Sequence, residues 1–140
     1  MRARFPRWII IPALALLACA PGNGGVKRAD APDSPNIIGS WNWTETTGGI
    51  AGITKTPESS GETWSIEFKK DGTFREVRNG VEHTGSYGIQ IRESIFDHQQ
   101  RPALLMEGRQ IMIIELPGPD RLHLSDNVYD GFNSTFTKTR

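Results

Sequence analysis

The sequence has little of several features that define common protein classes. Its 140 residues include one cysteine, Cys19, which excludes a disulfide within the chain and a zinc site built from cysteines. It also has no excess charge, with 16 basic and 16 acidic side chains. Arg2, Arg4 and Arg7 lie in residues 1–18, where there is no acid, so the remainder carries 13 basic and 16 acidic side chains. A mildly acidic remainder lacks the basic surface typical of nucleic-acid binding, so no nucleic-acid partner is expected.

The apolar stretch near the N-terminus is short. Trp8–Ala18 has 11 residues, whereas a membrane-spanning helix needs about 20. A positive segment followed by a short apolar one is typical of a secretory signal peptide. The stretch ends in Leu16-Leu17-Ala18-Cys19, which resembles the lipobox of bacterial lipoproteins. That resemblance implies cleavage before Cys19, with acyl chains on its thiol and on the new amino group. The alternative is an ordinary signal peptide with an incidental cysteine.

These features predict three parts: a signal peptide over residues 1–18, a flexible tether over 19–36 that begins at a lipidated Cys19, and a folded domain over 37–140. The tether is rich in glycine, proline, alanine and aspartate and has too little apolar surface to fold by itself. Its 18 residues would span roughly 25 Å as a random coil. We therefore expect a lipid-anchored protein of the cell envelope. In a Gram-negative cell, Ala20 in place of an aspartate after the cysteine favours the outer membrane, on its periplasmic or surface face.

From Ile37 onward, apolar and polar residues alternate in short segments separated by turn signals. Asp71-Gly72 and Asn79-Gly80 are typical of tight hairpins. The pattern predicts eight strands: Ile37–Thr47, Thr63–Lys69, Phe74–Arg78, Val81–Ile91, Ala103–Glu107, Gln110–Leu116, Arg121–Ser125 and Phe132–Thr139.

Eight strands joined by tight turns form an antiparallel meander, because two-residue turns connect only neighbouring antiparallel strands. Such a sheet leaves exposed edges unless it closes on itself. We therefore predict an all-β fold, an eight-stranded antiparallel up-and-down β-barrel, with a two-sheet sandwich as the alternative. The segment Arg92–Gln100 departs from the alternation and is compatible with a short helix or a long loop.

The domain resembles the small bacterial lipocalin-like lipoproteins. Gly39-Ser40-Trp41 matches the Gly-x-Trp that opens the first strand in lipocalins, and Gly48–Glu62 matches their long first loop over the barrel mouth. The resemblance implies that the tryptophan closes one end of the barrel and packs against a basic side chain near the C-terminus, here Lys138 or Arg140. The domain is shorter than a typical lipocalin and has no sign of its C-terminal helix. An eight-stranded barrel encloses either a packed core or one small ligand.

Motifs for catalysis or metal binding are weak. In Gly48–Thr56 the glycines precede Lys55, but Thr54 occupies the position where a phosphate loop needs glycine. His83, His98 and His123 have no spacing that places two imidazoles on one metal, and we interpret them as solvated surface residues. No nucleophile elbow is present. We therefore expect neither an enzyme nor a cofactor or metal site.

The candidate ligand-binding residues are mostly aromatic and fall on the apolar faces of the predicted strands or in the long loop. They are Trp41, Trp43, Ile50, Ile53, Trp64, Phe68, Phe74, Tyr87 and Met106. The alternative interpretation of the strand aromatics is a packed core, because a domain near 100 residues needs such side chains to fold. Ile50 and Ile53 are expected to face the interior if the long loop acts as a lid.

In the strand Gln110–Leu116, four apolar residues follow one another, so two of them point outward. Ile111 and Ile113 oppose Met112 and Ile114. An outward apolar pair marks either a partner surface or a contact with the Arg92–Gln100 segment.

Two functions fit the sequence. The first is an anchored barrel that binds or carries a small hydrophobic molecule, held by apolar burial. The second is a packed barrel that acts as a protein-interaction module, in envelope assembly or as an inhibitor. The expected partners are therefore the membrane, through lipid on Cys19, and either a small ligand or an envelope protein.

Overall fold

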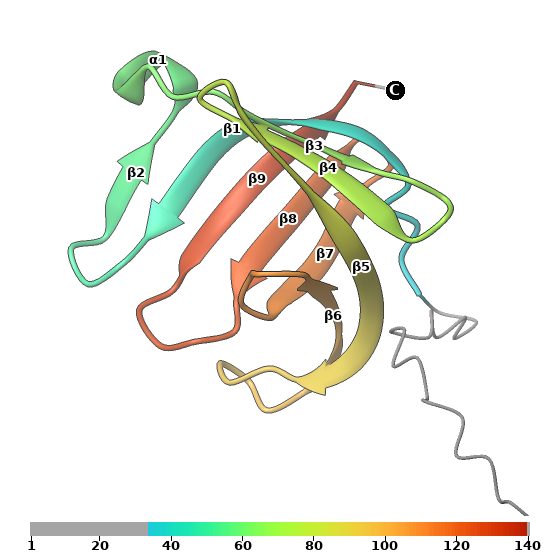
Figure 1. The fold of residues 1–140 in the computed structure, drawn as a ribbon. Helices are drawn as coiled ribbons and strands as arrows, with labels where there is room; N and C mark the ends of the chain where they lie inside the picture. Colours follow the sequence, from blue (N-terminus) through green and yellow to red (C-terminus); the bar gives the residue numbers. More distant parts are fainter. Residues whose placement is uncertain (1–33, 140) are drawn as a thin grey trace, which may run out of the picture.

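The computed structural model describes residues 34–139. This part of the chain forms nine strands and one short helix (Figure 1). In chain order they are β1 Gly39–Gly48, β2 Ile53–Lys55, α1 Pro57–Ser60, β3 Trp64–Phe68, β4 Thr73–Arg78, β5 Val81–Glu93, β6 Gln100–Met106, β7 Met112–Gly118, β8 Arg121–Asp126 and β9 Phe132–Lys138. The predicted signal peptide, Cys19 and nearly all of the predicted tether lie outside the described residues.

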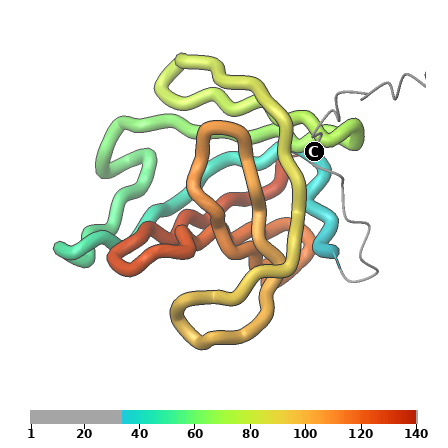
Figure 2. Tube along the Cα trace, turned by 60° about the horizontal axis from the view of Figure 1, so that its bottom comes forward, coloured from blue at the N-terminus to red at the C-terminus, as the bar shows by residue number. Residues whose placement is uncertain are grey.

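The sheet closes into an eight-stranded antiparallel barrel, as predicted. Its strands follow the order β1-β3-β4-β5-β6-β7-β8-β9, and β9 pairs back with β1. The closing register joins Trp41 to Lys138 at one end and Gly48 to Phe132 at the other. The first and last strands consequently lie side by side in both views (Figures 1 and 2). Closure removes the exposed edges that an open meander would leave.

All eight predicted strands are present, with ends that differ by up to three residues. The sequence did not predict β2 and α1, which lie within the segment Gly48–Glu62. Strand β2 pairs with the second half of β1, whereas β3 pairs with its first half. Thr56 caps α1, and its side chain accepts a hydrogen bond from the backbone N–H of Ser59. These short elements make the predicted loop a partly regular structure beside the barrel.

The predicted break at Arg92–Gln100 consists of the ends of β5 and β6 and a turn-rich connection over residues 94–99, and it contains no helix. Asn127 holds it in place: its side-chain oxygen accepts from the N–H of Ile95, and its amide donates to the carbonyl of Glu93. The N–H of Asn127 also donates to the carbonyl of Ile111 at the start of β7. On β7, Ile113 is buried, although it lies outside the main apolar cluster. Met112 and Ile114 are the pair that packs against the core, so Ile111 and Ile113 are the pair on the other face, where Ile111 is partly exposed.

The barrel end at the start of β1 is closed by Trp41, which is fully buried. Its indole N–H donates to the carbonyl of Ile37 at 2.8 Å. The ammonium of Lys138 lies 5.2 Å from the centre of the indole ring, a distance typical of a cation–π contact. Lys138 is one of the two basic residues expected there. This end of the barrel is consequently filled by side chains.

No helix among residues 34–139 has the length and apolar character to cross a membrane.

Candidate functional site

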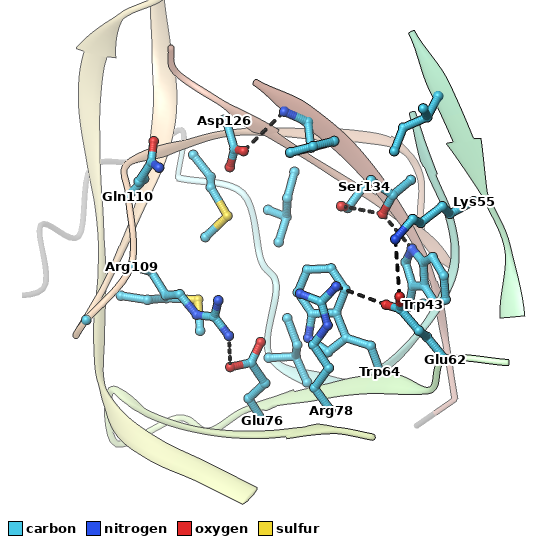
Figure 3. A pocket seen from close by; sticks show the side chains of 18 residues that line it. Trp43, Lys55, Glu62, Trp64, Glu76, Arg78, Arg109, Gln110, Asp126 and Ser134 are labelled. Carbon is cyan, nitrogen blue, oxygen red and sulfur yellow. Dashed lines mark hydrogen bonds and ion pairs between the residues drawn. The ribbon is translucent and has the colours of Figure 1, made fainter. Parts of the chain in front are cut away.

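A pocket of about 390 Å³ lies inside the barrel (Figure 3). This volume falls within the range of small-molecule sites, roughly 300–1,000 Å³. Its apolar lining consists of Trp43, Ile53, Trp64, Ile66, Met106, Met112, Leu124 and Phe132. The remaining lining residues are polar or glycine: Thr46, Lys55, Glu62, Glu76, Arg78, Gly108, Arg109, Gln110, Asp126 and Ser134. The pocket therefore has an apolar body and a ring of polar groups.

A bulge in β1 shapes one wall of this pocket. The pairing of β1 with β9 shifts between Trp43 and Glu45, which leaves Thr44 as the extra residue. The shift changes the phase of the strand, so Trp43 and Thr46 both line the pocket although they are three residues apart. The indole N–H of Trp43 donates to the hydroxyl of Thr46 at 2.8 Å, and that hydroxyl also bonds to Ser134. This chain of hydrogen bonds fixes the orientation of Trp43.

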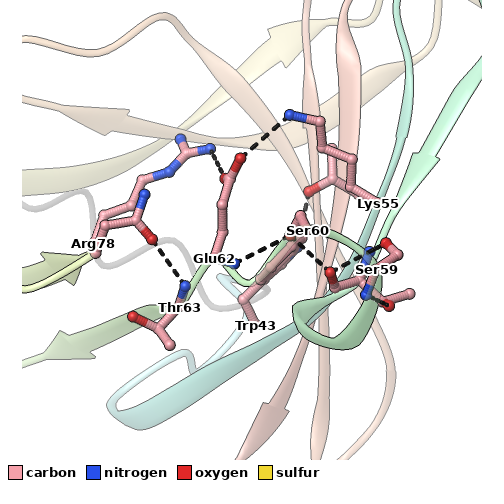
Figure 4. Close-up of polar contacts among 10 residues, drawn as sticks. Trp43, Lys55, Ser59, Ser60, Glu62, Thr63 and Arg78 are labelled. Carbon is pink, nitrogen blue, oxygen red and sulfur yellow. Dashed lines mark hydrogen bonds and ion pairs between the residues drawn. The ribbon is translucent and has the colours of Figure 1, made fainter.

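Glu62 joins two basic side chains at the edge of the pocket (Figure 4). Its two carboxylate oxygens accept from Lys55 at 3.2 Å and from Arg78 at 3.1 Å. These two hydrogen bonds, that from Arg78 first, hold the pKa of Glu62 below its ordinary value. Since Lys55 lies on β2 and Arg78 on β4, the carboxylate connects the short extra strand to the barrel wall.

Glu76 is the most deeply buried ionisable side chain of the pocket, with 2 % of its surface exposed. Its neighbours on the same face of β4 are Phe74 and Arg78. Arg109, from the connection between β6 and β7, donates to one carboxylate oxygen, Oε2. The other oxygen, Oε1, is buried and has no hydrogen-bond partner within the described part of the chain. Leaving such an oxygen unpaired is costly, because it has lost its hydration.

Trp64 carries a second unpaired polar atom in the same pocket. The guanidinium of Arg78 lies over its ring, 4.8 Å from the ring centre, and Phe136 packs edge-on at 4.8 Å. Its indole N–H is buried and has no acceptor among the described residues. Trp64 pairs directly with Arg78 across β3 and β4, and Ile66 pairs with Glu76. Trp64 and Glu76 therefore occupy adjacent positions on the inner face of the barrel.

Of the nine candidate ligand-binding residues, four line the pocket: Trp43, Ile53, Trp64 and Met106. Another four, Trp41, Phe68, Phe74 and Tyr87, belong to the packed core and lie outside the lining. The core and the pocket are continuous, because Trp43 and Met106 line the pocket and also belong to the apolar core cluster.

Ile50 requires a correction. It was expected to face the interior, but it is 89 % exposed and lies in the turn between β1 and β2. Pairing of β2 with β1 holds this turn away from the pocket, so that only Ile53 reaches the lining.

The histidines fall in different surroundings. His98 and His83 are exposed and His123 is half-buried, and no group of three or more potential metal ligands occurs among residues 34–139. His83 is exposed, as interpreted from the sequence, although it pairs with Glu76 and its ring packs 5.6 Å from that of Phe74. Residues directly opposite each other in an antiparallel pair share a face, so His83 lies on the inner side of the sheet.

Sequence reasoning missed the polar half of the pocket. Glu76 and Arg78 alternate with Arg75 and Val77 on β4, so the strand pattern itself placed them beside Phe74 on one face. That signal was present but unused, because charged residues are rarely fully buried. Arg109 had no such signal, since it lies in a turn.

No protein-family model matches this chain, and no curated protein or solved structure matches it either.

Proposed function

We propose that this protein is a lipid-anchored envelope lipoprotein with a lipocalin-like barrel that binds a small, mainly hydrophobic molecule. The observation that carries the proposal is the 390 Å³ pocket, whose walls present Trp43, Trp64, Met106 and Met112. Aromatic and methionine side chains give a large apolar surface that adapts to different ligand shapes. Burial of apolar ligand surface would supply about 25 cal/mol per Å².

The binding half of this proposal is tested by native mass spectrometry of the full-length chain purified from cells. We expect an added mass that is lost on unfolding and that solvent extraction then identifies. The pocket variant Met112→Trp places a bulky ring in the lining and should abolish the added mass. Ile91→Trp is the matched control, because Ile91 is exposed and lies outside the lining. An added mass that both variants retain would contradict binding in this pocket.

The anchoring half is tested by metabolic labelling with palmitate. The full-length chain should take up the label and sediment with membranes, whereas Cys19→Ser should do neither. Label retained in the Cys19→Ser variant would contradict lipidation at this residue.

We infer a protein-interaction module as the second candidate function, and one observation favours it. The turn between β1 and β2 lies beside the connection between β8 and β9, since the N–H of Gly49 donates to the carbonyl of Gly131 at 3.1 Å. Together these loops and the first residue of β9 expose Ile50, Val128, Tyr129 and Phe132. Exposed apolar side chains gathered on neighbouring loops are typical of contact surfaces. Ile50→Ser with Tyr129→Ser should then abolish partner capture and leave the mass of any pocket ligand unchanged.

A further inference from the structure

The two unpaired buried atoms of the pocket have complementary requirements. Oε1 of Glu76 is an acceptor that lacks a donor, and Nε1 of Trp64 is a donor that lacks an acceptor. Both residues line the same pocket, and in Figure 3 the carboxylate of Glu76 points into it. A molecule that fills the pocket with only apolar groups would leave both atoms unpaired. A molecule that pairs both must donate one hydrogen bond and accept another.

The charges around these atoms restrict the ligand further. Three basic and three acidic side chains line the pocket: Lys55, Arg78, Arg109, Glu62, Glu76 and Asp126. The basic ones are already paired, Lys55 and Arg78 with Glu62 and Arg109 with Glu76. A carboxylate ligand would approach Oε1 of Glu76 without a proton to donate, so like charges would oppose it. An ammonium ligand would leave the Trp64 N–H unpaired and lie near two guanidinium groups.

We propose that the pocket selects a neutral ligand with an apolar body and one hydroxyl or primary amide head group. This inference rests on the proposed function and adds to it the chemical class of the ligand. The head group donates to Oε1 of Glu76 and accepts from Nε1 of Trp64. Its apolar body lies against Met106, Met112 and Leu124. Glu76 and Trp64 are then the residues that determine ligand specificity.

Four probes with the same chain test the proposal: decanol, decanamide, decanoate and decylammonium. The full-length chain, purified from cells into lipid nanodiscs, is titrated with each probe, and empty nanodiscs serve as the blank. The readout is the spectrum of the ¹⁵N-labelled tryptophan indoles, in which the Trp64 signal is identified by its loss in Trp64→Phe. Decanol and decanamide should bind at least about tenfold more tightly than the two charged probes. Each charged probe leaves one buried atom without a hydrogen bond, and such a loss weakens binding by about this factor. Both should move the Trp64 N–H signal downfield.

Glu76→Gln keeps the size of the side chain and replaces one carboxylate oxygen with an amide. If the remaining oxygen stays on Arg109, the new amide donates into the pocket, so an acceptor-only head group becomes favourable. The order of affinity should therefore reverse in favour of decanoate. Glu82→Gln is the matched control: it removes the same charge from the exposed pair with Arg75, and the original order should persist.

The outcomes separate the inference from the proposed function. If all four probes bind equally and the Trp64 signal does not shift, the pocket binds apolar molecules without reading their head groups, and the inference is overturned while the proposed function stands. If decanoate binds most tightly to the unmodified chain, the inference is likewise overturned. If none of the probes binds, both are overturned.

Discussion

Replacing Glu76 by methionine tests whether this carboxylate serves the fold or the pocket. In the structure Glu76 is 2 % exposed, its Oε1 is unpaired, and its partner Arg109 keeps 38 % of its side chain exposed. An unpaired buried oxygen costs about 1–3 kcal/mol. A buried ion pair gives little net stability, because the desolvation of its charges offsets their attraction. Without Glu76, Arg109 can still reach water.

We therefore expect Glu76→Met to raise the free energy of unfolding of the ligand-free chain by about 1–3 kcal/mol. For a domain of this size the melting temperature should rise by about 4–8 °C per kcal/mol. The reciprocal variant Arg109→Met should lower the free energy of unfolding by about 3–5 kcal/mol, since it leaves a buried carboxylate with no partner. The asymmetry between the two variants identifies Glu76 as a group that the fold tolerates rather than needs.

The assay is equilibrium urea unfolding, followed by tryptophan fluorescence, with Glu82→Met as the exposed control. The control should change the free energy of unfolding by no more than about 0.5 kcal/mol. A decrease of more than about 1 kcal/mol in Glu76→Met, with the control unchanged, would refute the reasoning. The ion pair between Glu76 and Arg109 would then stabilise the fold, and the burial of Glu76 would no longer argue for a ligand.

Three further predictions concern the barrel itself. Gly48→Ala should lower the free energy of unfolding by more than Gly52→Ala does, by about 1–3 kcal/mol against about 1–2 kcal/mol. The reason is that a Cβ at Gly48 would lie 2.4 Å from a backbone oxygen, whereas one at Gly52 meets nothing within 4 Å. Equal losses of stability in thermal unfolding would contradict this. Lys138→Met should lower the free energy of unfolding by about 0.5–1 kcal/mol through loss of the contact with Trp41. If high salt abolishes the difference between the parent chain and this variant, the lysine acts as a simple surface charge instead. The hydrogen bond from Arg101 lowers the pKa of Asp97 from 3.8 to about 2, so its contribution to stability is complete above pH 3.8 and is lost as the pH falls towards 2. Asp97→Asn should therefore flatten the acid dependence of the melting temperature in that range, and an unchanged slope would show that other acids dominate.

The sequence by itself determined an antiparallel meander of eight strands, and the pairing of β9 with β1 closed it into a barrel instead of the alternative sandwich. Alternation predicted the inward residues of most segments, though not of Gln110–Leu116, and Asp71-Gly72 and Asn79-Gly80 predicted antiparallel neighbouring strands. These signals are local, because a strand pattern and a hairpin turn each depend on a few adjacent residues. The unpredicted strand β2 lacks such a signal, since it is three residues long and is defined only by its pairing with β1. The helix α1 has local signals, Thr56 at its N-cap and Pro57 in its first turn, but it is only four residues long.

Tertiary structure alone decided which inward residues form core and which form pocket. Trp41 and Trp43 share a face in the sequence pattern, yet Trp41 is enclosed by Ile37 and Lys138 while Trp43 borders the pocket. The bulge at Thr44, the approach of Arg109 to Glu76 and the unpaired indole of Trp64 arise from contacts between distant segments. Alternation says which side of a sheet a residue occupies, but the height of that residue in a closed barrel depends on the register of every strand around it.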